Sequence, residues 1–267
     1  TLPGETAYTH TGLSTGTAYY YKVIAVDAQN NLSGASNEVT YTPVDTTPPT
    51  ISSTNPANGA TGVAFAPSAS VTFSEAMNVA NAQAAYSVKK TNCSGATVST
   101  GSPTSTNPTF TYTLTNLEPS TVYAHCVTTT ATDSAGNALA TAYSSTWTTA
   151  ALTEPTGVTF TPGDMQVTIS FVVGNGNGGV QIVRGAAGAA APADCNSGTA
   201  VYNGSTSPQV ETGLTNGQTY AYRVCTRHNA GAYLSAGVTG SATPVADTTP
   251  PTVSSTTPTN GATSIAT

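Results

Sequence analysis

Apolar and polar residues alternate with a period of two through many short stretches of this chain. Three of these runs begin at Tyr19, Tyr123 and Tyr220 and place an apolar side chain at nearly every second position. Such alternation is typical of a β-strand with one buried face. Across residues 151–245 the pattern predicts seven strands, at residues 158–161, 165–173, 180–184, 199–202, 208–214, 220–227 and 236–243. Seven short strands in about ninety residues is the number expected of a β-sandwich.

Composition excludes several other classes of protein. The 267 residues carry only 12 acidic and 6 basic side chains, a charged fraction of 7%, and the net charge is −6. Six scattered cations do not form a nucleic-acid surface. No apolar run approaches the 18 residues that a membrane span needs. Abundant Thr and Val favour strands over helices, and 38% hydrophobic residues argue against disorder.

A Leu precedes each of the three Tyr residues by six positions. The pairs are Leu13 and Tyr19, Leu117 and Tyr123, and Leu214 and Tyr220, with a turn-forming stretch inside each gap. In β-sandwiches a Tyr just after a corner bonds its hydroxyl to the backbone a few residues upstream, an arrangement called the tyrosine corner. We therefore predict tyrosine corners at Tyr19, Tyr123 and Tyr220.

The sequence repeats itself at an interval of about 202 residues. The string Asp-Thr-Thr-Pro-Pro-Thr at residues 45–50 returns at residues 247–252, and the residues after it also match. One period has room for two small β-domains. We therefore expect the chain to begin partway through one unit, to stop partway through another, and to continue natively on both sides. The Pro-rich string favours a short, stiff joint between extended domains.

Two families account for these segments. Residues 213–224, Gly-Leu-Thr-Asn-Gly-Gln-Thr-Tyr-Ala-Tyr-Arg-Val, resemble a fibronectin type III domain, although Phe171 stands where that family usually has Trp. Residues 71–78, Val-Thr-Phe-Ser-Glu-Ala-Met-Asn, resemble a bacterial Ig-like domain of the FSE-x-M type, as does Asp-Ser-Ala-Gly-Asn at residues 133–137. The resemblances imply tandem antiparallel β-sandwiches in an extended array.

These resemblances divide the chain into four segments. Residues 1–44 are expected to be the C-terminal part of a fibronectin type III domain, and residues 45–150 a bacterial Ig-like domain. Residues 151–245 are expected to be a complete fibronectin type III domain, and residues 246–267 the start of a further Ig-like domain.

The four cysteines predict two structural disulfides. Cys126 and Cys225 fall on the outer face of their strands, and each has one upstream partner in its own domain, Cys93 and Cys195 respectively. We expect the pairs Cys93–Cys126 and Cys195–Cys225, and hence an oxidising compartment. A metal site is the weaker alternative, because a Cys-x-x-His spacing occurs only once, at residues 225–228.

Other candidate chemistry is explained more simply by structure. His10, His125 and His228 lie in three different segments, and His125 falls on the core face of its strand. Oxygen ligands in residues 27–31 and 133–137 suit Ca²⁺, but turn formation accounts for the same residues. The Gly-rich residues 174–179 lack the Lys-Ser/Thr of a phosphate-binding loop and predict a hairpin connection. We expect no catalytic residue, no cofactor and no metal.

The leading hypothesis is a non-catalytic repeat segment of an extracellular fibre, filament or adhesin stalk, secreted and associated with the cell surface. Its expected partners are further copies of itself or neighbouring repeats, and surface glycans are a second candidate. Nucleic acid and a membrane span in this segment are not expected. The alternative is a spacer or binding region of a large secreted carbohydrate-active enzyme, because both resembled families occur in many contexts.

Overall fold

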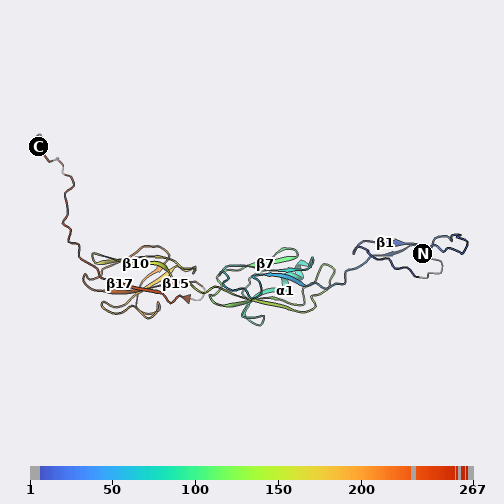
Figure 1. Cartoon of the computed structure of the whole chain (residues 1–267), viewed down its shortest axis with the longest axis horizontal. Coiled ribbons are helices and arrows are strands. Elements are labelled where there is room, and N and C mark those ends of the chain that lie inside the picture. The colour runs from blue at the N-terminus through green and yellow to red at the C-terminus, as the bar shows by residue number, and fades with distance from the viewer. Residues whose placement is uncertain (1–6, 230–232, 256, 258–259, 262, 264–267) are drawn as a thin grey trace. The chain divides into compact units, whose positions relative to one another are not determined.

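The computed structural model describes residues 7–229, 233–255, 257, 260–261 and 263. Its internal contacts divide the chain into two units, Thr1–Ala150 and Ala151–Thr267, and each is described by itself (Figure 1). Among the described residues, no helix has the length and apolarity that crossing a bilayer requires. The expected Ig-like start at residues 246–267 lies partly outside the described residues, and residues 246–255 carry no assigned strand.

The elements are almost entirely strands, joined by turns and loops. The first unit contains β1 Tyr19–Tyr21, β2 Val39–Tyr41, β3 Ile51–Asn55, β4 Ser68–Phe73, α1 Val79–Ala85, β5 Tyr86–Lys90, β6 Thr104–Thr106, β7 Thr109–Thr113, β8 Val122–Val127 and β9 Tyr143–Thr148. The second contains β10 Thr156–Gly163, β11 Gln166–Val172, β12 Val180–Arg184, β13 Thr199–Gly204, β14 Gln209–Thr212, β15 Tyr220–His228, β16 Tyr233–Leu234 and β17 Val238–Ala242.

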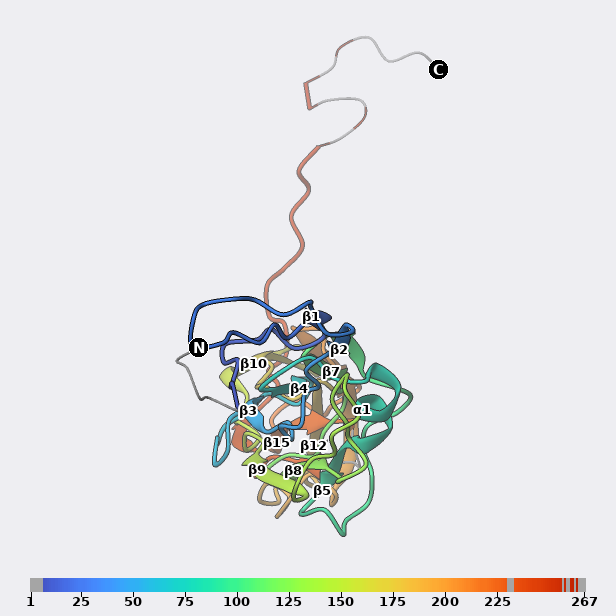
Figure 2. The same ribbon diagram turned by 90° about the vertical axis from the view of Figure 1, so that its right-hand side faces the viewer.

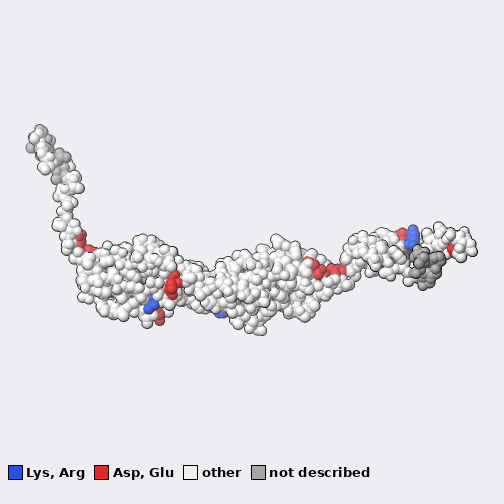
Figure 3. Space-filling model, in the orientation of Figure 1, with Lys and Arg blue, Asp and Glu red and all other residues white. Residues whose placement is uncertain are grey.

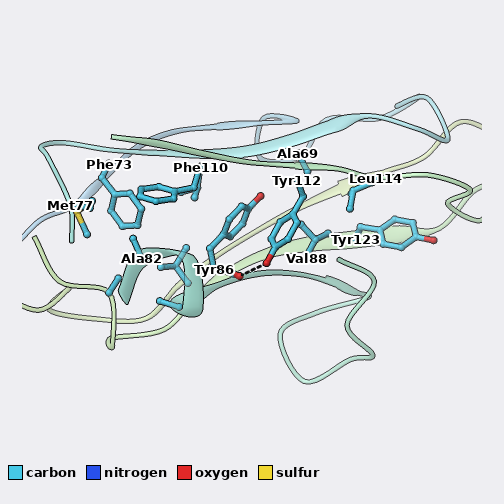
Figure 4. Packing of buried hydrophobic residues seen from close by; sticks show 14 of the residues in the cluster. Ala69, Phe73, Met77, Ala82, Tyr86, Val88, Phe110, Tyr112, Leu114 and Tyr123 are labelled. Carbon is cyan, nitrogen blue, oxygen red and sulfur yellow. Dashed lines mark hydrogen bonds between the residues drawn. The ribbon is translucent and has the colours of Figure 1, made fainter. Parts of the chain in front are cut away.

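Strands β3 to β9 form a sandwich, here called the first sandwich. One sheet has the order β3-β4-β7-β6 and the other β5-β8-β9, and all the strand pairs are antiparallel. Alternate residues of β4 and β7 point inward, so that Phe73 and Phe110 meet edge to face with ring centroids 5.7 Å apart. The Tyr112 hydroxyl donates to the Tyr86 carbonyl oxygen across the core, at 3.1 Å (Figure 4). The alternating pattern of the sequence therefore becomes a core between two sheets.

The helix α1 is an element that the strand pattern does not predict. It is rich in Ala, the best helix former, and it leads directly into β5 (Figure 2). Asn78 caps its N-terminus by accepting the backbone N–H of Asn81, at 3.2 Å. Ala82 and Ala85 are buried, so one face of the helix closes an end of the core.

Strands β10 to β17 form the second sandwich. Its smaller sheet has the order β10-β11-β14, and the other joins β13, β12 and β15 with β16 and β17 on different parts of β15. Each of the seven strands that the sequence predicts is present, and β16 is added. Ile169 and Ile182 from facing sheets are fully buried in the core. The prediction of an all-β fold of antiparallel sandwiches is confirmed.

Residues 7–44 have a sheet of two strands only. β1 pairs with β2, and an isolated bridge joins Val26 to Leu32. Val23, Ile24, Val39 and Tyr41 are all exposed. This segment therefore has strands without an opposing sheet among the described residues.

Candidate functional site

The disulfide Cys93–Cys126 joins a loop to a central strand of the first sandwich. The two Cα atoms lie 5.6 Å apart, and Cys126 is on β8. Cys93 sits in the tight turn after β5, where a Cβ added to Gly95 would collide with the carbonyl oxygen of Lys90. Glycine at that position therefore allows the loop to fold back over the sheet and bring its cysteine to β8.

The disulfide Cys195–Cys225 has the same placement in the second sandwich. The Cα atoms lie 6.3 Å apart, and Cys225 is on β15. Both cysteines are buried with Val183 and the partly buried Leu234, in a small apolar cluster separate from the main core. The outer face that the sequence assigns to Cys126 and Cys225 is therefore covered rather than open to solvent. The pairing agrees with the one expected, and loop closure is worth on the order of 3 kcal/mol for each bond.

The three Tyr residues that follow the corners all bond back to the backbone. The hydroxyl of Tyr19 accepts the N–H of Ser14 at 2.8 Å, that of Tyr123 accepts Glu118 at 2.9 Å, and that of Tyr220 accepts Thr215 at 3.1 Å. In each case the donor lies five residues upstream. This is the geometry of a tyrosine corner.

His125 is a buried polar residue inside the first sandwich. Its Nδ1 lies 2.8 Å from the Tyr86 hydroxyl, its Nε2 lies 3.1 Å from the carbonyl oxygen of Pro56, and its ring centroid is 4.4 Å from that of Trp147. Burial lowers the pKa of His125 to about 4, so the ring is neutral at pH 7. His10 instead contacts Tyr21, at 3.0 Å, and His228 is buried in the second sandwich. The structure therefore does not bring the three histidines together.

The two loops that suit Ca²⁺ by composition have identical hydrogen bonding. In both, one carboxylate oxygen accepts the backbone N–H groups two and four residues later, and the other accepts the side-chain amide of the Asn four residues later, at 2.8–2.9 Å. The acceptors are Asp27 and Asp133. The Asn31 side chain lowers the pKa of Asp27; at Asp133 burial opposes ionisation, but the bonds from Asn137 and the backbone still lower the pKa. Turn formation therefore occupies these oxygens.

A carboxylate cluster forms where three segments meet. One ligand oxygen each from Asp45, Glu75 and Asp133 lies within 4.8 Å of the others, the one such group of three found among the described residues. Burial, and then the charges of Asp45 and Asp133, raise the pKa of Glu75. Asp45 is further tied in because Asn137 donates to its carbonyl oxygen at 3.1 Å. Both Asp133 oxygens already accept hydrogen bonds within their turn, so Glu75 and Asp45 are the members of the cluster that could share a proton.

The sequence analysis includes Glu75 in the motif at residues 71–78 and Asp133 in the turn at residues 133–137, but it gives Asp45 no role beyond the repeated string. Asp45 belongs to the repeated Asp-Thr-Thr-Pro-Pro-Thr string, which reads as a joint between domains. The whole string returns at residues 247–252, so the repeat alone does not single out Asp45 as a partner of Glu75 and Asp133. A pocket of about 220 Å³ in this unit is lined by Pro49, Thr50, Ile51 and residues 139–143, none of which is charged.

One family model matches part of the chain. Residues 45–149 match the family model of the bacterial Ig-like domain, which confirms the resemblance drawn from residues 71–78 and 133–137. No curated protein matches the chain.

Three solved structures illustrate the structural likeness. The FN1–FN3 domains of chicken CNTN1 share 16% identity over 85% of this chain and 77% of that one, with a TM-score of 0.30. A two-domain fibronectin type III segment of chicken tenascin shares 14% over 74% and 99%, with a TM-score of 0.33. The N-terminal part of the bacterial S-layer protein SbsC shares 14% over 74% and 44%, with a TM-score of 0.30.

Proposed function

We propose that this chain is a non-catalytic structural segment of an extracellular protein, serving as a stalk, filament or surface layer made of repeated sandwiches. The observation that carries the proposal is that the side chains best suited to chemistry all have structural roles. All four cysteines are disulfide-bonded, and the corner tyrosines and His125 bond within their own domain. Disulfides of this kind persist in oxidising compartments.

Each of the four segments has its own role in this proposal. Residues 45–150 and 151–245 act as whole modules, and residues 1–44 and 246–267 belong to neighbouring modules of the array. Each of the two sandwiches buries its own core, which suits modules that act as spacers in an array.

The surface suits close packing against further copies. The outer face of the β3-β4-β7-β6 sheet carries two rows of uncharged polar side chains in register: Ser53, Thr72, Thr109 and Thr106, and Asn55, Ser70, Thr111 and Thr104. Charged atoms appear only in small separate patches on the face drawn in Figure 3. Two such faces meet without charge repulsion, unlike surfaces rich in Lys and Glu.

Surface labelling of the source cells tests the proposal. An antibody against residues 45–245 should label intact cells and recognise a high-mass species that protease removes from the cell exterior. Labelling only after permeabilisation would contradict an extracellular role. Co-purification of the labelled species with hydrolysis of a polysaccharide would instead favour the enzyme-accessory alternative.

A substitution on the hydroxyl rows tests self-packing. Thr72→Glu combined with Thr109→Glu puts like charges on directly opposed residues of one face. If the face packs against copies, sedimentation should show less association for this variant than for a control with Thr146→Glu and Ser144→Glu on the other sheet. Equal association of the two variants would refute packing through this face.

A further inference from the structure

A segment near the start of the first sandwich lies beside its last strand, and both run in the same direction. Between β3 and residue 59 the chain passes from one sheet to the other, and residues 59–63 then follow the end of β9. Val63 and Thr149 form a parallel bridge. We call residues 58–63 and 146–150 together the parallel pair. The pair extends the β5-β8-β9 sheet on the side of β9 that β8 does not occupy.

Hydrogen bonds join the parallel pair along its whole length. Four backbone bonds run between its halves, and each half donates and accepts in turn, as in a regular parallel ladder. The donors and acceptors, in order, are Gly59 N–H to Thr146 O at 2.7 Å, Thr148 N–H to Ala60 O at 2.8 Å, Val63 N–H to Thr148 O at 3.2 Å, and Ala150 N–H to Val63 O at 2.8 Å. A side chain supplies a fifth bond, because Thr146 N–H also donates to Asn58 Oδ1, at 3.1 Å.

Both halves of the pair are anchored to the rest of the sandwich. Just ahead of the first half, the Pro56 carbonyl oxygen accepts from Nε2 of the buried His125, at 3.1 Å. The second half is held on its other side by the β8–β9 ladder and by the buried Thr149, whose hydroxyl donates to the Glu118 carbonyl oxygen at 2.6 Å. Neither half can therefore slide without breaking bonds to its neighbours.

The direction of the two segments determines how tension on the chain acts on them. Because they are parallel, the chain enters the first half at the end opposite to that where it leaves the second. Once β3 has separated from β4, tension therefore pulls the halves lengthwise past each other and stretches all five bonds together. Strands that are peeled apart from one end lose their bonds one at a time. Forced opening is governed by the rate of this rupture rather than by the equilibrium free energy.

The second sandwich has no comparable pair among its described residues. Its first strand β10 pairs with β11, its last strand β17 pairs with β15, and the two lie in different sheets. One backbone hydrogen bond joins the ends of these segments, from Val245 N–H to Gly163 O at 3.1 Å. The Glu154 carboxylate adds bonds from the Ser235 hydroxyl and the Gly237 N–H, but these lie ahead of β17. Tension there passes through the packing between sheets, without a ladder from first strand to last.

We propose that the parallel pair is a mechanical clamp, which makes the first sandwich the load-bearing module of this chain and leaves the second sandwich to open first under tension. The second sandwich is then the extensible element, and its disulfide Cys195–Cys225 keeps 30 residues from extending when it opens. The use of such a clamp rests on the proposed role in a stalk or filament, because a stalk held at both ends carries tension. The order of opening is a property of the two folds alone.

The experiment pulls the full chain at constant load by handles attached to its two termini. The wild type should open in two steps, and the second sandwich should have a folded lifetime roughly tenfold shorter than that of the first. Cys93→Ala with Cys126→Ala assigns the steps, because it frees 33 residues in the first sandwich only. The step of that sandwich should then lengthen by roughly 11 nm, since an extended residue spans about 3.4 Å.

A pair of matched variants tests whether the clamp bears the load. Asn58→Ala with Ala150→Pro removes one side-chain acceptor and one backbone donor from the parallel pair. It should shorten the loaded lifetime of the first sandwich roughly fivefold. The control Ser99→Pro removes the same two kinds of bond elsewhere in this sandwich, from Ser99 Oγ and Ser99 N–H to the backbone of Val88. The control should lower the urea unfolding free energy but leave the loaded lifetime within about twofold of the wild type.

Two results would overturn the proposal: a first sandwich that opens as early as the second, or a control that shortens the loaded lifetime as much as the clamp variant. Should either proline variant not fold, Asn58→Ala and Ser99→Ala are compared instead, since each removes one acceptor of a backbone N–H. Only Asn58→Ala should then shorten the loaded lifetime, and equal lifetimes would refute the clamp. These results do not depend on where the protein resides, which surface labelling tests separately.

Discussion

The two sandwiches place their disulfides alike but handle buried polar groups differently. Each links a late central strand to a loop after a middle strand, over 33 residues in the first sandwich and 30 in the second. In the first, a neutral His125 sits among Tyr86 and Trp147. The cross-link therefore belongs to the shared architecture, and the polar chemistry belongs to each domain.

The second sandwich instead uses a charged group at the margin of its core. Glu211 accepts Arg184 Nε at 2.8 Å and the Tyr222 hydroxyl at 2.7 Å, and the Arg184 guanidinium lies 4.9 Å from the centre of the Tyr220 ring. Burial, followed by Glu211, raises the pKa of Tyr222. Salt weakens an ion pair but has little effect on a neutral ring, so the two sandwiches can be distinguished by the salt dependence of their stability.

Removing the disulfides should have the largest effect, and it should be equal in the two sandwiches. The double variants Cys93→Ala with Cys126→Ala, and Cys195→Ala with Cys225→Ala, should each lose roughly 3–4 kcal/mol of unfolding free energy, because loop closure depends only weakly on loop length. Trp147, the single Trp of the chain, reports the first sandwich by fluorescence, and amide exchange reports the second. A clearly larger loss in one sandwich would show that buried packing around its sulfur atoms contributes more than the loop.

Acid should destabilise the first sandwich through His125. Its pKa in the folded state is about 4, below the unfolded value of 6.5, so the unfolded chain binds the proton first and stability falls as pH drops from 6.5 towards 4. The expected loss between pH 7 and pH 4.5 is about 2.5 kcal/mol. Urea unfolding followed by Trp147 fluorescence at pH 7 and pH 4.5 measures it.

The variant His125→Gln serves as the control, because Gln keeps hydrogen-bonding capacity but does not titrate. It should be less stable than the wild type at pH 7. Its unfolding free energy should change much less between pH 7 and pH 4.5 than that of the wild type. A pH dependence that survives in this variant would assign the acid sensitivity to other groups.

The tyrosine corners should give a smaller effect that depends on the surrounding sandwich. Tyr123→Phe and Tyr220→Phe each remove one hydroxyl acceptor of a backbone N–H, and each should cost around 1 kcal/mol. Tyr19→Phe should cost less, because Tyr19 is only partly buried and its bond from Ser14 is exposed, so that water replaces the lost acceptor, whereas Tyr123 and Tyr220 are buried. Denaturation midpoints test the first two, and an unchanged midpoint would leave only apolar packing as the reason for the Leu-to-Tyr spacing.

The smallest effect is expected at the Lys90–Glu118 pair of the first sandwich. Its side chains are 39% and 29% exposed, compared with 18% and 15% for Arg184 and Glu211. Glu118→Gln should therefore cost less than about 1 kcal/mol of unfolding free energy. Glu211→Gln should cost more, because it leaves the largely buried Arg184 without its charged partner. The unfolding free energies of both variants in low and high salt test this comparison. Equal losses for the two variants would mean that side-chain exposure does not determine the strength of the two pairs.

Much of the fold could be predicted from patterns among residues that are close together in the sequence. Period-two alternation places the seven strands of residues 151–245, and the six-residue spacing identifies the corners, because both depend on residues close together in sequence. The bacterial Ig-like segment was recognised from two short motifs for the same reason. The helix α1 was not predicted, because its seven residues are too few to show a helical period in the sequence.

From the sequence alone we predicted which residues form strands, which cysteines share a domain, and that residues 1–44 resemble the C-terminal part of a fibronectin type III domain. The packing of the folded chain was needed to show that Asp45 joins Glu75 and Asp133, and that loops cover Cys126 and Cys225. The reason is the range of the interactions. Alternation and turns are written in neighbouring residues, but contacts between loops and opposing sheets depend on how distant segments pack, and no local pattern records that packing.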